Sequence, residues 1–160
     1  MWTQIIDELN GTFSSVPWHI SAIRLLAALL LAAAIGIERE WRGKPAGLRT
    51  HMLISMAACL FILVSQQLAA LPFGAPDALR VDPLRLVEAV TAGVAFLAAG
   101  MIFTSGGKVH HVTTGASMWL AGAIGLASGA GQMPLAALAT GIVVVVLFVL
   151  GLAERGFNGE

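Results

Sequence analysis

The chain alternates between long apolar segments and short polar ones. The apolar segments run over residues 17–37, 51–71, 83–103, 114–131 and 134–153. Each has about 18 to 21 residues, close to the ~20 that an α-helix needs to cross a hydrocarbon core of ~30 Å. Lone strands cannot satisfy their backbone groups in lipid, so the segments should be helices. The pattern predicts an all-α polytopic membrane protein with about five transmembrane helices.

Helix-start signals support two of these segments, and glycines weaken one. Pro17 and Pro83 suit the first turn of a helix, and Asp82 can act as an N-cap. The segment 114–131 is the least certain, and we expect it to be tilted or partly re-entrant. Its glycines are Gly122, Gly125, Gly129 and Gly131.

The residues before the first span carry a shorter helical pattern. Trp2, Ile5, Ile6 and Leu9 are spaced to share one face, which fits an interfacial helix. A frayed tail is the alternative. Acidic residues at positions 7 and 8 are unlike the basic start of a signal peptide. We expect an N-terminal segment over 1–16, a membrane domain over 17–153 and a short cytoplasmic tail over 154–160.

Composition agrees with a membrane protein. The 160 residues are 58% hydrophobic and 11% charged, whereas soluble domains have roughly half apolar and a quarter charged residues. The net charge is zero, so there is no basic footprint for nucleic acid. The single cysteine, Cys59, excludes a disulfide framework. The histidines lack metal-ligand spacing and no catalytic motif is present, so we expect no metal, cofactor or enzymatic activity.

Lysine and arginine set the expected orientation. With five helices, Arg39, Arg42, Lys44, Arg49, Lys108 and Arg155 share one side, whereas Arg80 and Arg85 lie on the other. The positive-inside rule makes the first side cytoplasmic. We therefore expect the N-terminus outside and the C-terminus in the cytoplasm.

Two charges fall inside the predicted spans. Arg24 lies in the first span and Glu88 in the third, at similar depth below the outer surface. Alanines share their helix faces and would allow close packing. We expect these two helices to pack together, with Arg24 and Glu88 paired. Snorkelling of Arg24 to phosphates, or a charge-lined cavity, are the alternatives.

Charges of both signs also crowd the first cytoplasmic corner, "IGIEREWRGKPAGLRTH". Glu38 precedes Arg42 by four residues, the favourable order for a helical ion pair. Thr50 could cap the next helix. Either a polar cluster forms at the cytoplasmic mouth of the bundle, or these are ordinary solvated charges. The expected cluster comprises Glu38, Arg39, Arg42, Gly47, Arg49 and Thr50.

Three sequence blocks resemble the MgtC/SapB family of bacterial inner-membrane proteins. They are "RLLAALLLAAAIGIEREWRGKPAGLRTHMLI", "DPLRLVEAVTAGVAFLAAGMIF" and "GGKVHHVTTGASMWLAGAIGLASGAG". The last two blocks match at Asp82, Arg85, Gly93, Phe96, Gly100, Thr113, Thr114 and Trp119. Ala95 and Ala98 stand where the family usually has glycine. Many relatives continue into a cytoplasmic ACT-like domain, which we expect to be missing after Glu160.

The resemblance implies a role in adaptation to low magnesium, acid stress or growth inside host cells. It also implies binding to other membrane proteins, with the ATP synthase as a possible partner, and a homo-oligomer is expected. Our first reading is a small regulatory protein of the inner membrane. The alternative is a proton or cation transporter or channel subunit that uses Glu38, Glu88 and Arg24. An intramembrane enzyme has the least support.

Overall fold

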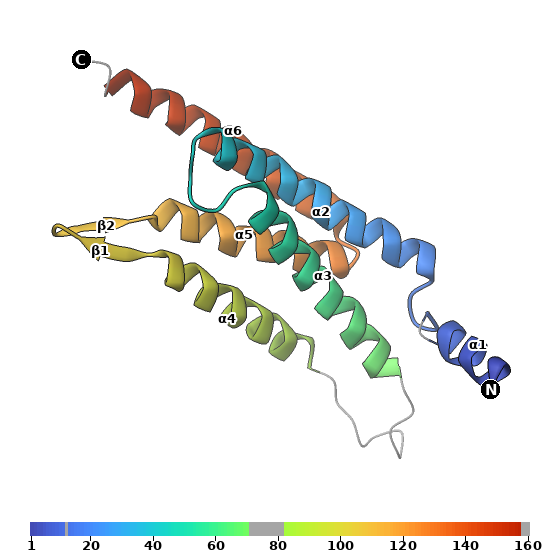
Figure 1. Cartoon of the computed structure of the whole chain (residues 1–160). Coiled ribbons are helices and arrows are strands. Elements are labelled where there is room, and N and C mark those ends of the chain that lie inside the picture. The colour runs from blue at the N-terminus through green and yellow to red at the C-terminus, as the bar shows by residue number, and fades with distance from the viewer. Residues whose placement is uncertain (12, 71–81, 158–160) are drawn as a thin grey trace.

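The computed structural model describes residues 1–11, 13–70 and 82–157 (Figure 1). The elements are α1 (Trp2–Gly11), α2 (Trp18–Trp41), α3 (Leu48–Ala70), α4 (Pro83–Met101), β1 (Phe103–Ser105), β2 (Lys108–His110), α5 (Val112–Gly129) and α6 (Met133–Phe157). Parts of three predicted features lie outside the described residues. They are the end of the second span at Leu71, Arg80 of the outer loop, and residues 158–160 of the tail.

Each of the five predicted apolar segments corresponds to one long helix, α2 to α6 in order. By length and hydropathy, α2, α3 and α4 qualify as membrane spans in the described part of the chain, and Met133–Val149 within α6 forms a shorter apolar helix. The predicted fold class, an all-α polytopic membrane protein, is confirmed. The segment 2–9 is also helical, within α1, instead of a frayed tail.

Several predicted helix ends were wrong. The third span ends at Met101, because Phe103 enters a hairpin in which it pairs with His110. Gly106 and Gly107 adopt φ of +58° and +75° at the hairpin turn, where left-handed residues suit the strand twist. At the C-terminal end, α6 continues through Phe157 into the segment expected to be a tail.

Helix α5 is the centre of the bundle and packs against α2, α3, α4 and α6. In Figure 1 it lies between α4 and the α2–α6 pair. Its glycines allow this close packing. A Cβ added at Gly122 would lie 2.9 Å from Val94 of α4, and one added at Gly129 would lie 2.8 Å from the Cys59 carbonyl oxygen of α3. The Gly-rich sequence that weakened the helix prediction therefore produces the innermost helix.

The predicted packing of the first and third spans, α2 and α4, was wrong. Helix α4 packs chiefly on α5, whereas α2 packs on α3, α5 and α6. The small residues of α2 are used within this bundle, where Ala28 and Ala32 are completely buried. A small-residue face indicates a close neighbour, but it does not identify which helix that neighbour is.

The two ends of the bundle carry different connections. One end holds the α2–α3 corner, the β-hairpin and the end of α6, whereas α1 lies at the other end (Figure 1). Gln67 of α3 holds the segment that follows α1, since its amide donates to the Gly11 carbonyl at 2.7 Å and to Ser14 Oγ at 2.9 Å.

Candidate functional site

Glu38 lies at the centre of a polar cluster near the end of α2. The residue is 9% exposed, and its neighbour Arg39 is 3% exposed. Arg39 Nη1 lies 3.6 Å from Glu38 Oε2, and Arg42 Nε forms an ion pair with Glu38 Oε1 from one helical turn away. The predicted face of α2 is therefore correct, because Glu38 points into the bundle as Ile35 does.

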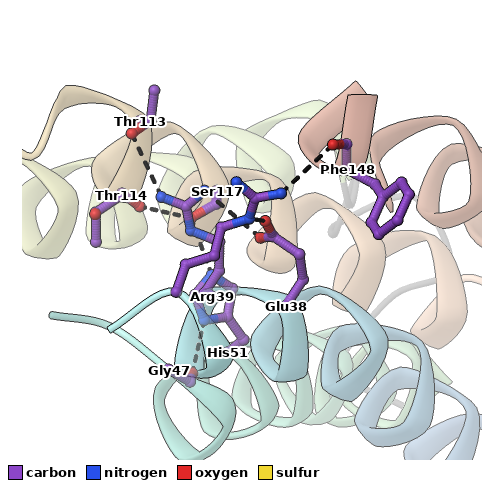
Figure 2. Close-up of polar contacts among 9 residues, drawn as sticks. Glu38, Arg39, Gly47, His51, Thr113, Thr114, Ser117 and Phe148 are labelled. Carbon is purple, nitrogen blue, oxygen red and sulfur yellow. Dashed lines mark hydrogen bonds and ion pairs between the residues drawn. The ribbon is translucent and has the colours of Figure 1, made fainter. Parts of the chain in front are cut away.

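The two arginines connect α2 to other helices. Arg39 Nη2 donates to Thr113 Oγ1 at 3.4 Å, at the start of α5 (Figure 2). Arg42 Nη2 donates to the Phe148 carbonyl oxygen of α6 at 3.4 Å. The Arg42 guanidinium lies against Gly151, where any added Cβ would overlap it. Glu38 thus holds two cations that join three helices.

The remaining members of the predicted cluster play different parts. Arg49 is exposed and Thr50 is partly buried. Thr50 is not the helix cap, because α3 already begins at Leu48. Instead, the backbone N–H of Leu48 donates to Glu40 Oε2 at 2.7 Å. A carboxylate at a helix N-terminus is favourable, which explains the second acid of the corner.

A buried histidine was missed by the sequence reasoning. His51 has no exposed surface, and its Nδ1 lies 2.8 Å from the Gly47 carbonyl oxygen. Its Nε2 lies 3.0 Å from Ser117 Oγ, which in turn donates to the Thr114 carbonyl oxygen at 2.9 Å (Figure 2). The spacing along the helix could have indicated this burial, because His51 shares one helical face with Ser55 and Ala58. All three residues are buried in the structure.

A pocket of about 290 Å³ opens beside Glu38, between α2 and α6. Glu38 and Arg42 form its polar part. The rest of the lining is apolar or aromatic: Ala34, Ile37, Trp41, Val144 and Phe148. The site therefore offers a buried carboxylate with two guanidinium partners at the edge of an apolar groove.

Arg24 forms a second polar site near the other end of α2, and its predicted pairing with Glu88 was wrong. Arg24 Nη1 donates to the Gly129 carbonyl oxygen at 2.8 Å and to Gln66 Oε1 at 3.1 Å. Glu88 is exposed on α4 and forms no ion pair with Arg24. The reason is topological, because Arg24 faces α3 and α5 whereas α4 packs on the far side of α5.

The family-motif positions have local structural roles or are exposed. Asp82 caps α4 by accepting from the Leu84 N–H at 3.0 Å, and Arg85 Nε lies 4.0 Å from Asp82 Oδ2. Thr114 is 1% exposed, whereas Trp119 is 48% exposed. The other exposed positions are Gly93, Phe96, Gly100 and Thr113.

The part of the chain that the structure describes contains no preformed metal-binding site. No group of three or more histidine, cysteine, aspartate or glutamate side chains there is arranged to hold an ion. The Glu38 cluster contains one carboxylate and two arginines, so its formal charge of about +1 disfavours cation binding.

Comparison with known proteins places the sequence in a family. Residues 25–155 match the MgtC family. The chain belongs to the MgtC family. The matched region begins one residue after Arg24 and contains the whole Glu38 cluster.

Named MgtC-family relatives share more than a third of their aligned residues with this chain. The "Putative magnesium transporter YhiD" of Escherichia coli K12 is 39% identical over 132 residues, covering 79% of this chain and 59% of the relative. "Protein MgtC" of Salmonella typhimurium LT2 is 38% identical over 136 residues, covering 85% and 54%. The chain thus spans 54 to 59% of the length of these relatives. No solved structure matches.

Proposed function

We propose that this chain is a non-enzymatic regulatory protein of the bacterial inner membrane. It acts by binding other membrane proteins during adaptation to low magnesium, acid stress or growth inside host cells. Its N-terminus is outside and the α2–α3 corner faces the cytoplasm, in accordance with the positive-inside rule. Membership of the MgtC family supports the biological setting.

The sealed interior of the bundle is the observation that carries this proposal. The space between Glu38 and Arg24 is filled by small and apolar side chains. Ala28, Ala32, Ile35, Cys59 and Ile124 are all 0 to 1% exposed. An ion path needs polar groups or water along its length. The Ser55 hydroxyl is buried between the two charged sites, but it donates to the Ala28 carbonyl oxygen at 2.9 Å, so the described residues form no continuous polar line there. This favours partner binding over transport through one subunit.

The cytoplasmic corner presents side chains that a partner could contact. Arg49 is exposed there, and Trp41 is 85% exposed. Exposed arginine and tryptophan are enriched where protein interfaces gain most of their binding energy. We propose that Arg49 binds an acidic side chain of a membrane partner. The family resemblance makes the ATP synthase the first partner to test.

Transport remains the second candidate, on one specific observation. Glu38 lines a pocket of about 290 Å³ between α2 and α6. A relative also carries the name "Putative magnesium transporter YhiD". A second subunit covering this pocket would be required to enclose a path.

One pair of assays separates the two functions. Purified protein in liposomes is expected to give no proton or Mg²⁺ flux above that of empty vesicles. In inverted membrane vesicles, added protein is expected to lower ATP synthesis, and Arg49→Ala should lose this effect. Lys44→Ala, at the same corner, is the matched control. Proton or Mg²⁺ flux through the wild-type protein, with no effect on ATP synthesis, would replace regulation with transport.

A further inference from the structure

Helix α4 contacts the bundle along a narrow strip. In the most apolar stretch of 18 residues, only 17% of α4 is buried, against 28% of α2 and 33% of α3. The buried positions are Val90, Val94 and Ala98, which follow one another at intervals of four residues. This strip packs on α5, where Gly122 accommodates Val94. Most of the α4 circumference therefore faces away from the subunit.

The side of α4 turned away from this strip carries an ordered series of residues, here called the α4 seam. All five of its members are exposed, and their spacing alternates between three and four: Arg85, Glu88, Ala92, Ala95 and Ala99. Alternating spacings of three and four define the contact positions of helices that wrap around each other. Alanine at three of these positions would allow two helix backbones to approach closely.

Glu88 is the member of the seam that most needs a neighbour. It lies five residues after Pro83, roughly 7 to 8 Å along the helix. Its carboxylate makes no ion pair or side-chain hydrogen bond with any described residue. A charged carboxylate in a span is usually turned toward protein or a water-filled cavity rather than toward lipid tails.

Opposite charges one helical turn apart make the seam self-complementary. Arg85 is the only other charge on the seam, and its side chain is 85% exposed. It has one weak neighbour, Asp82, at 4.0 Å. If two copies pack with parallel α4 helices around a two-fold axis, equivalent residues lie at the same height, and the long Arg85 side chain can reach diagonally to the Glu88 of the other copy, about 4.5 Å further along the helix. Symmetry then forms the same contact twice.

We propose that the α4 seam is a homodimer interface in the membrane, closed by reciprocal Arg85–Glu88 contacts between the two copies. The two-fold axis runs along the membrane normal, so that both copies keep the same orientation. The alanines form the close-packed layers below the charged pair. This interface does not depend on the proposed function, because it uses no residue of the Glu38 cluster or of the α2–α3 corner.

Cysteine cross-linking in bilayers tests the geometry. In a Cys59→Ala background, Ala92→Cys places a thiol on the seam, and Gly93→Cys places one beside it on the groove toward α3. Both positions are exposed, and a Cβ at Gly93 meets nothing within 4 Å. Oxidation at high lipid-to-protein ratio is expected to give dimers for Ala92→Cys, and for Ala95→Cys, but not for Gly93→Cys. A disulfide needs Cα atoms within about 7 Å of each other, so it reports a close contact at the substituted position. The high lipid-to-protein ratio keeps products of random collision low.

Charge exchange tests the proposed pair. Arg85→Glu and Glu88→Arg are each expected to reduce the Ala92→Cys dimer at least several-fold, because each single variant places like charges together. The double variant should recover most of it. Circular dichroism confirms that each variant is folded. The proposal is overturned if Ala92→Cys and Gly93→Cys cross-link equally, or if no seam position gives a dimer. It is also overturned if the cross-link forms to a different protein, or if the double variant gives no more dimer than the single variants.

Discussion

Substituting alanine for Gly125 should separate α3 from α5, two helices that pack closely on each other. A Cβ at this position would overlap the Ser55 carbonyl oxygen, and it would lie 2.8 Å from the Ser55 carbonyl carbon and 2.9 Å from Ala58 Cβ. Two of these three atoms belong to the backbone of α3, so no side-chain rotation can relieve the contact. The helices α3 and α5 must move apart.

The expected loss of stability follows from two opposing terms. Replacing glycine by alanine within a helix gains about 1 kcal/mol through helix propensity. Overpacking a filled core typically costs about 1–3 kcal/mol, and a backbone clash belongs at the upper end of that range or above it. We therefore expect Gly125→Ala to lower the free energy of unfolding by about 2 kcal/mol.

Cys59 provides a direct assay for this movement. It is the single cysteine of the chain, it is completely buried, and its backbone packs against Gly129 of α5. A membrane-permeant maleimide should label Cys59 slowly in the wild-type protein and faster in Gly125→Ala. Unfolding by increasing SDS in mixed micelles, followed by circular dichroism, would give the difference in free energy.

Gly141→Ala is the matched control. It lies in a helix of the same bundle, and an added Cβ there meets nothing within 4 Å. It should be neutral or more stable by up to about 1 kcal/mol, with unchanged labelling of Cys59. If Gly125→Ala proves as stable as Gly141→Ala and leaves Cys59 protected, the close packing of α3 on α5 is refuted.

Three further substitutions test the polar sites. Gly151→Val should displace the Arg42 guanidinium and so remove one partner of the buried Glu38 carboxylate. The free energy of unfolding in mixed micelles should fall by about 1–3 kcal/mol, and an unchanged value would contradict the contact between Arg42 and Gly151. His51→Ala should cost at least about 2 kcal/mol in the same assay, because it leaves two buried hydrogen bonds unmade and a cavity behind, whereas an unchanged value would contradict its burial. The exchange Arg24→Glu with Glu88→Arg should be no more stable than Arg24→Glu alone, and recovery would restore the direct pair.

The sequence was sufficient for features that depend on local periodicity and composition. Five apolar stretches of suitable length predicted the five long helices, because lipid allows few other structures. The spacing of Glu38 and Arg42 predicted their ion pair, since residues four apart on a helix are neighbours. Burial of Glu38 also followed from its position on the helix face.

Contacts between helices could not be predicted in the same way. Gly125 and Gly129 only weakened the helix prediction, whereas in the structure both pack against α3 within the subunit. Arg24 was assigned a carboxylate partner because opposite charges at one depth suggest a pair. In the structure it binds a carbonyl oxygen at Gly129, the residue where α5 ends. Backbone acceptors at helix ends carry no signature in the side-chain sequence.

The two acids of the α2–α3 corner each have a structural task. Anchoring in the membrane requires only the positive residues there, yet Glu38 and Glu40 lie among them. Glu40 accepts from the first amide of α3, so it specifies where the second helix begins. Glu38 holds Arg39 and Arg42 while these reach α5 and α6. Because both acids have structural tasks, loss of function on replacing Glu38 would not by itself identify an ion path. Arg49, which is exposed, is the more specific test of partner binding.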